Sequence, residues 1–215
     1  MPVRKIPKNY LFVTGGYSSQ KSTEMAAFES LLEKDFLLLL DFDNSVERFD
    51  VQPVRIPVNG IPRGYVPDAL IFYHSDTITG LPRQPELVDV KNSAEAIRNA
   101  EKYRPKFAAA QEFASERGWL FKIVDETQIR TPRLANLKFL RAYRNVFPDQ
   151  DDVDRVLNLI QGNKSSSETL LSALAVSDEE RLYWLPIIWS MLLRQQLITD
   201  LDTPFLGDVP IFRGP

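Results

Sequence analysis

The chain has 215 residues, and its 44% hydrophobic and 26% charged residues describe an ordinary globular protein of one large domain or two small ones. Because it has no cysteine and a single histidine, His74, disulfides and thiolate metal sites are excluded, and a histidine zinc site or a Ser-His triad is disfavoured. With a net charge of −3, the protein either does not bind nucleic acid or is delivered to it by a partner, because phosphate neutralisation dominates DNA affinity.

The N-terminal region opens with a basic, proline-containing stretch at residues 1–9, which we interpret as an irregular arm, followed by a brief strand at 11–13. This start lacks the apolar core of a signal peptide, and no apolar run of the chain is long enough to span a membrane. We therefore expect a cytoplasmic protein without a membrane segment.

The first predicted helix begins after Ser22 or Thr23, either of which is a good N-cap, and runs to about Leu40. Glu29 and Glu33 lie on or beside its apolar face, one turn apart. A carboxylate near an apolar face is unfavourable unless something pairs with it. The two residues are therefore either salt-bridged glutamates at a helix margin or carboxylates that lean toward a functional site.

The next part of the chain alternates short strands with helices, and this order predicts an α/β unit with a mixed central sheet covered by helices. Gln52-Pro53 marks a break or edge in the first strand region, and Pro105 suits the first turn of a helix. The predicted strands are 46–58 (one or two), 65–72, 86–92 and 119–124, and the predicted helices are 93–102 and 103–117.

Beyond a connector near residues 125–133 the chain becomes mostly helical. Short helices followed by strand-like pieces over 199–212 predict a winged-helix-like module, with Pro186 breaking or kinking its last helix. The apolar stretch 182–189 favours core packing or protein docking over base readout, because groove-reading helices present polar side chains. The predicted helices are 134–145, 151–161, 166–175 and 178–197.

Two of the strands end in residues that can perform phosphodiester chemistry. Asp89 and Lys91 are two apart on one strand and share a face, and Asp68 lies at the end of the neighbouring strand. Two carboxylates can hold a hard divalent cation, and a lysine beside them can stabilise developing negative charge. Taken alone, this pattern is a weak signal, because two strands with solvated, charged ends are the more common explanation of it.

The ordered set of residues along the chain resembles the TnsA family, the endonuclease subunits of heteromeric cut-and-paste transposases. The resemblance implies a restriction-endonuclease-like PD-(D/E)xK domain over residues 1–128 and a C-terminal, winged-helix-like, partner-binding domain over 129–215. The residues that carry it are Ser19-x-Lys21, Glu29-Ser30-Leu31-Leu32-Glu33, Val46, Gln52-Pro53, Pro67-Asp68, Asp89-x-Lys91, Asp125, Ile129, Asn136, Leu137 and Leu140.

By this resemblance, the catalytic residues are Glu33, Asp68, Asp89 and Lys91, with Glu33 rather than Glu29 as the acid of the first helix. The three acids would bind Mg²⁺ in a two-metal site, for which Mn²⁺ can substitute, and Lys91 would position water or stabilise the transition state. Some family members have glutamine or glutamate at the position of Asp89.

The start of the resemblance also marks two candidate DNA-contacting residues, Ser19 and Lys21. No organic cofactor is expected.

The implied function is cleavage of the 5′ ends of a transposon, on the strands that are not joined to the target. The implied partners are double-stranded DNA at transposon ends, a TnsB-type DDE transposase that cuts and joins the 3′ ends, and a TnsC-type AAA+ regulator. Three alternatives remain open: a stand-alone restriction or repair nuclease of the same fold, an inactive assembly scaffold, and an α/β protein without a metal.

Overall fold

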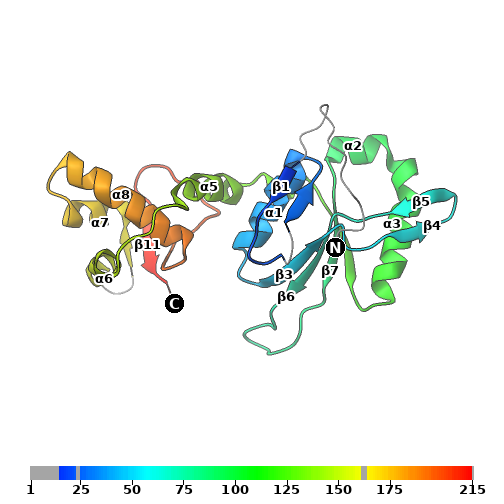
Figure 1. Cartoon of the computed structure of the whole chain (residues 1–215), viewed down its shortest axis with the longest axis horizontal. Helices are drawn as coiled ribbons and strands as arrows, with labels where there is room; N and C mark the ends of the chain where they lie inside the picture. Colours follow the sequence, from blue (N-terminus) through cyan, green and yellow to red (C-terminus); the bar gives the residue numbers. More distant parts are fainter. Residues whose placement is uncertain (1–14, 23–24, 161–163, 215) are drawn as a thin grey trace. The chain divides into compact units, whose positions relative to one another are not determined.

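The computed structural model describes residues 15–22, 25–160 and 164–214, and the predicted arm at 1–9 and strand at 11–13 lie outside these ranges. The chain divides into two compact units after Arg130, two residues beyond the boundary expected from the sequence. The first unit spans Met1–Arg130 and the second spans Thr131–Pro215 (Figure 1). Each unit is described below by itself.

The first unit is an α/β unit built around a mixed four-stranded sheet with the strand order β3-β6-β7-β8. In this sheet β6 runs antiparallel to both β3 and β7, whereas β7 and β8 are parallel. Its elements are β1 (Gly15–Tyr17), β2 (Ala26–Phe28), α1 (Leu31–Phe42), β3 (Val46–Val51), β4 (Ile56–Val58), β5 (Ile61–Tyr65), β6 (Ala69–Tyr73), β7 (Glu86–Val90), α2 (Ser93–Arg98), α3 (Ala100–Ser115), β8 (Leu120–Val124) and α4 (Glu126–Ile129).

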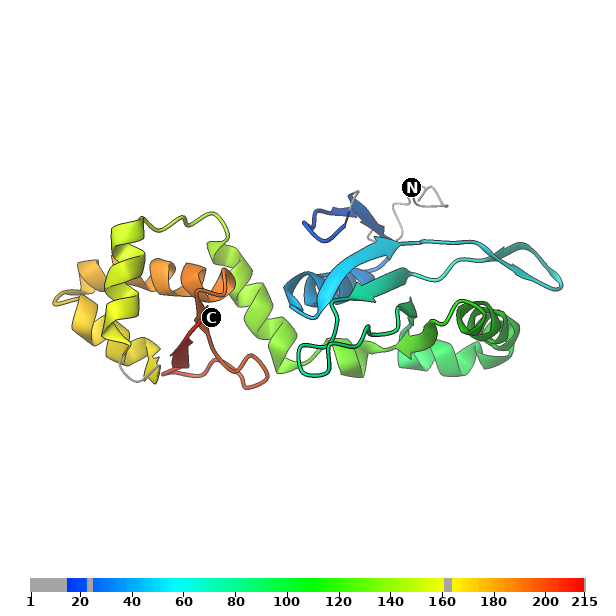
Figure 2. The same cartoon turned by 90° about the horizontal axis from the view of Figure 1, so that it is seen from below.

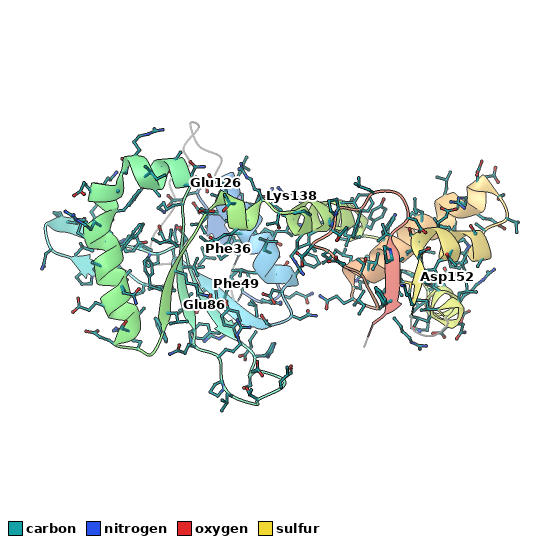
Figure 3. The ribbon with its side chains drawn as sticks, turned by 180° about the vertical axis from the view of Figure 1, so that it is seen from behind. Phe36, Phe49, Glu86, Glu126, Lys138 and Asp152 are labelled. Carbon is teal, nitrogen blue, oxygen red and sulfur yellow. The ribbon has the colours of Figure 1, made fainter. Side chains whose placement is uncertain are left out.

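Helices α1 and α3 lie on opposite sides of this sheet (Figure 1). On the α3 side, Leu70 and Leu87 are paired in register and pack with Ala110 of the helix. Figure 3 labels Phe36 of α1 and Phe49 of β3, which are both buried where α1 meets the sheet. Apolar packing on both faces of the sheet thus holds β6 and β7 in place. Asp68 lies just before β6, and Asp89 lies near the end of β7.

The β4–β5 ribbon extends beyond the end of the central sheet (Figure 2). The positive φ of 62° at Gly64 explains the glycine there, because a Cβ atom would lie 2.5 Å from the carbonyl oxygen of Ile56. The ribbon ends at Tyr65, which packs edge to face on Phe107 of α3 with ring centres 6.2 Å apart. This contact attaches the ribbon to the helix that covers the sheet.

The predicted start of the first helix is wrong. The segment Ala26–Phe28, which was expected to lie in the helix, instead forms β2 and pairs antiparallel with β1, and α1 begins at Leu31. The side chain of Ser30 is the N-cap and accepts a hydrogen bond from the backbone N–H of Glu33. Ser30 and Glu33 have the Ser-x-x-Glu spacing of a capping box, a stronger start signal than the lone polar residue Ser22.

The two predicted helices after β7 are present with different bounds. They meet at Asn99, and Pro105 lies inside α3 rather than in its first turn. The missing N–H of Pro105 leaves the carbonyl of Glu101 without its helical partner. Glu101 is exposed, so water can satisfy that carbonyl and the helix continues.

The second unit combines helices with a small three-stranded antiparallel sheet of order β10-β11-β9. Buried residues from α6, α7, α8 and this sheet form one apolar cluster, which includes Val156, Leu170, Ile188 and Ile211. The elements are α5 (Pro132–Leu140), the 3-10 turn η1 (Arg141–Tyr143), α6 (Gln150–Leu159), β9 (Lys164–Ser166), α7 (Ser167–Leu174), α8 (Asp178–Leu193), β10 (Leu197–Ile198) and β11 (Pro210–Arg213).

Helix α8 supplies the centre of this core rather than an apolar docking face. Trp184, Ile187, Ile188 and Trp189 are all buried, so most of the stretch that was a candidate for protein docking packs inside its own unit, whereas Leu182 and Tyr183 at its start are exposed. The expected break at Pro186 does not occur, and the helix runs continuously across it. None of the helices within the described residues is both long and apolar enough to cross a membrane.

Candidate functional site

The candidate site lies where β6 begins and β7 ends, because these two strands are antiparallel neighbours. The backbone N–H of Asp68 donates to the carbonyl of Val88 at 3.0 Å, which places Asp68 beside the end of β7. Its side chain then accepts a hydrogen bond from the N–H of Val90 at 2.7 Å through Oδ2. In Figure 3, Glu86 marks the start of β7, and Glu126, just past β8, marks the end of the sheet that carries the site.

Lys91 brings the two aspartates together. Its Nζ lies 2.8 Å from Oδ2 of Asp89 and 3.5 Å from Oδ2 of Asp68. Burial alone would lower the pKa of Lys91, but the charges of Asp68 and Asp89 outweigh it and raise the pKa above its usual value. Lys91 is therefore a protonated ammonium held between two carboxylates, and the predicted sharing of a strand face by Asp89 and Lys91 holds.

Asp89 is the most enclosed acid of the site, with 0% of its surface exposed. Within the described residues, neither of its side-chain oxygens accepts a well-formed hydrogen bond, so the ammonium of Lys91 is its main countercharge. The hydroxyl of Tyr65 is also buried nearby, and burial together with the charge of Asp89 raises the pKa of this tyrosine. The buried carboxylate of Asp89, with the ammonium of Lys91 as its main neighbour, is a chemically suitable position for a hard cation.

The carboxyl group of Asp68 is buried close to two other acids, Asp89 and Glu33. Burial is the main cause that raises its pKa well above the usual range, and the charges of Asp89 and Glu33 add to it. The charge of Lys91 and the hydrogen bond from Val90 oppose this shift. A cation placed among these acids would relieve their repulsion.

Glu33 comes from the N-terminal turn of α1. Its Oε2 accepts the N–H of Glu29 at 2.8 Å, and its Oε1 accepts the hydroxyl of Ser30 at 3.0 Å. Burial, followed by the charge of Glu29, raises the pKa of Glu33, whereas these hydrogen bonds and the charge of Lys91 lower it. Glu33 thus belongs to the same electrostatic group as Lys91, but both its oxygens are engaged at the helix terminus.

The acids do not form a ready-made metal cage. Over 15–22, 25–160 and 164–214, no three Asp, Glu or His side chains come close enough together to hold a metal ion. In this arrangement the ammonium of Lys91 contacts both aspartates, and Glu33 is bonded to its own helix end. The chemical type of these donors nevertheless fits Mg²⁺, which prefers carboxylate oxygens.

Ser19 and Lys21, the two candidate DNA-contacting residues, contact the end of α1 instead. The hydroxyl of Ser19 donates to Oδ1 of Asp41 in a short hydrogen bond, and the ammonium of Lys21 donates to the carbonyl oxygens of Leu40 and Asp43 at 3.3 and 2.6 Å. A lysine at this position satisfies carbonyls that have no helical partner. DNA contact by these residues stays a prediction.

Two residues of α3 near the site were not singled out from the sequence. The ring of Tyr103 has the ammonium of Lys91 5.8 Å from its centre and that of Lys106 5.6 Å from it. Burial, then the charges of Lys102 and Lys91, lowers the pKa of Lys106, while Asp89 raises it, so Lys106 faces the same acid. The only sequence signal was the spacing of Lys102 and Lys106 one turn apart, a common feature of solvated helices.

Removal of the Ser30 hydroxyl is expected to affect both the fold and the site. Ser30→Ala removes the N-cap of α1, at a cost of about 1 kcal/mol in the free energy of unfolding. Because this hydroxyl also donates to Glu33, we expect the DNA cleavage that the resemblance implies to fall severalfold. Ser166, the N-cap of α7 in the second unit, is the matched control. Urea unfolding and cleavage assays should show similar losses of stability for both variants but a loss of cleavage for Ser30→Ala alone.

One family model matches the segment that carries most of the candidate site. Residues 43–126 match the family model described as TnsA-like endonuclease N terminal, and this segment contains Asp68, Asp89 and Lys91 but not Glu33. No curated protein matches the chain. Residues 43–126 of the first unit therefore form a TnsA-like endonuclease N-terminal domain.

Proposed function

We propose that the chain is the metal-dependent endonuclease subunit of a cut-and-paste transposase, which cleaves the 5′ ends of the transposon on the strands not joined to the target. The observation that carries this proposal is the convergence of Asp68 and Asp89 on the ammonium of Lys91 within a TnsA-like domain. That arrangement supplies carboxylate oxygens for a cation and a fixed positive charge for a phosphate in one place.

In this proposal Asp68 and Asp89 hold Mg²⁺, with Glu33 as the third carboxylate and Mn²⁺ as a substitute. The metal would supply Lewis-acid activation of water and of the scissile phosphate. Lys91 is the charge that stabilises the phosphorane-like transition state, and its position between two acids keeps it protonated for that role.

Metal binding can be measured without DNA or partners. Titration of the wild type with Mg²⁺ or Mn²⁺ by calorimetry should give saturable binding. Asp89→Asn should weaken this binding strongly, because it removes the buried negative charge. If Asp89→Asn binds either metal as tightly as the wild type, the proposed ligand set is wrong.

The proposed substrate is double-stranded DNA. Helix α3 offers cations beside the site that would contact the phosphate backbone of the DNA. Lys102 and Lys106 are one turn apart on α3. The ammonium of Lys106 beside the ring of Tyr103, and the exposed Lys102 one turn away, suit the phosphates that flank the scissile bond.

Loss of one of these cations should therefore weaken DNA binding in a salt-dependent way. Lys106→Ala is expected to reduce the slope of log K against log salt by about 0.9, the value for one phosphate contact. Arg104→Ala on the same helix is the control, since Arg104 already pairs with Glu101 at 2.8 Å. Fluorescence anisotropy with a labelled transposon-end duplex measures both slopes, and equal slopes for Lys106→Ala and the wild type would contradict a phosphate contact.

We also propose that the second unit is winged-helix-like and serves the assembly of the transposase. The order α6, β9, α7, α8, β10, β11, with a three-stranded sheet, supports this comparison. The partners would be a TnsB-type DDE transposase and a TnsC-type AAA+ regulator, by the family of the first unit. The buried residues of α8 are not the docking surface, because they form the core of the unit.

A further inference from the structure

Gln52 adopts a backbone conformation that its sequence position disfavours. Its φ is 47°, in the left-handed region, and the following residue is Pro53, which restricts the residue before it to extended conformations. Of the described non-glycine residues, only Gln195 shares a positive φ, and it follows the end of α8, where such a conformation is common. Gln52 follows a strand, so its strain needs another explanation.

The conformation allows Gln52 to bind two parts of the candidate site at once. Its backbone N–H donates to the carbonyl of Asp68 at 2.9 Å, and its side-chain Nε2 donates to Oε1 of Glu29 at 3.3 Å. The N–H of Glu29 in turn donates to the carboxylate of Glu33. Gln52 thus links the segment that carries Asp68 with the helix start that carries Glu33.

The side chain of Gln52 is only 4% exposed, and its amide oxygen has an unusual environment. This oxygen is fully enclosed and accepts no hydrogen bond from the described residues. A buried polar atom without a partner is unfavourable for folding, and such atoms are concentrated at functional sites. An apolar residue would fill the same space without this cost, which argues against a purely packing role for Gln52.

We propose that Gln52 is a positioning residue of the nuclease site, which holds the Glu29–Glu33 segment at a fixed separation from Asp68. This inference rests on the proposed function, because the separation matters only if Glu33 and Asp68 act on the same metal and phosphate. Three observations carry it: the strained backbone, the two hydrogen bonds to different acid-bearing segments, and the enclosed amide oxygen.

The hydrogen bond to Glu29 can be broken and then rebuilt with the opposite polarity. Gln52→Glu keeps the size of the side chain but places a carboxylate against Glu29, and cleavage is expected to fall about tenfold. The double variant Gln52→Glu/Glu29→Gln exchanges donor and acceptor and should recover most of the lost cleavage. Calorimetric titration with Mg²⁺ provides a second readout, with weaker binding in the single variant and recovery in the double variant.

A second variant keeps the test informative if Gln52→Glu fails to fold. Glycine accepts a φ of 47° without strain, so Gln52→Gly keeps the backbone conformation and removes only the side chain. We expect Gln52→Gly to fold, as judged by circular dichroism, and to cleave more slowly than the wild type. Wild-type cleavage and Mg²⁺ binding in Gln52→Gly, or a double variant no better than Gln52→Glu, would overturn the inference.

The same assays separate this inference from the proposed function. Asp68→Asn should be inactive whether or not Gln52 has a positioning role. If Asp68→Asn is inactive and the Gln52 variants are unaffected, only the positioning role fails. If Asp68→Asn cleaves like the wild type, the proposed site itself is wrong.

Discussion

Asp68→Asn is expected to abolish cleavage of the 5′ strand while leaving the first unit at least as stable as the wild type. The asparagine side-chain oxygen can still accept the hydrogen bond from Val90, so the local fold is kept. The substitution also removes a negative charge beside Asp89 and Glu33, which are causes of the raised pKa of Asp68. Cleavage should fall on the order of a thousandfold, the upper range for loss of one charge-stabilising group.

The control for Asp68→Asn is another strand aspartate of the same sheet. Asp50 lies in β3 and pairs with Arg48 at 3.0 Å rather than with Lys91, so Asp50→Asn should cleave like the wild type. Single-turnover rates and urea unfolding of both variants check the prediction. A large loss of stability in Asp68→Asn would show that the carboxylate is needed for the fold instead.

Lys91→Met is expected to reduce both cleavage and stability. The methionine fills a similar space but leaves Asp68 and the fully buried Asp89 without their shared countercharge. Breaking a buried ion pair from one side costs about 3–5 kcal/mol, and we expect the lower end because Lys91 is partly exposed. Cleavage should fall by about 10² to 10³, because the transition-state charge loses its stabilising cation.

A double variant distinguishes the two losses. Lys91→Met/Asp89→Asn removes both charges of the Lys91–Asp89 ion pair. It should recover much of the stability, because no buried charge of that pair is then left without a partner. It should not recover cleavage. Recovery of cleavage in the double variant would contradict a catalytic role for Lys91.

The sequence predicted the strands of the site well because their signals are local. Val, Ile, Leu and Phe concentrate in the strands that follow Asp68 and contain Asp89, and alternation on a strand placed Asp89 and Lys91 on one face. The antiparallel pairing of β6 with β7 then brings Asp68 to them. These three positions needed no information from distant parts of the chain.

Other features depended on contacts that the sequence does not display. The start of α1 was misplaced because β1 and β2 pair with each other, and this pairing competes with extension of the helix toward Ser22. The placement of Tyr103 and Lys106 near Lys91 arises from the packing of α3 on the sheet. The left-handed backbone of Gln52 is a tertiary effect, since both Gln and a following Pro oppose it locally.

Strand-specific cleavage at a transposon end tests the central claim most directly. The wild type and Asp68→Asn would each be mixed with the TnsB-type transposase, the TnsC-type regulator, end DNA and Mg²⁺, and cuts on both strands would be resolved. We predict that Asp68→Asn loses 5′-strand cuts and retains 3′-strand cutting and joining, and that chelation of Mg²⁺ stops all cuts. Persistence of 5′-strand cuts in Asp68→Asn would contradict the account, and cutting of plain duplex by the wild type alone would favour a stand-alone nuclease.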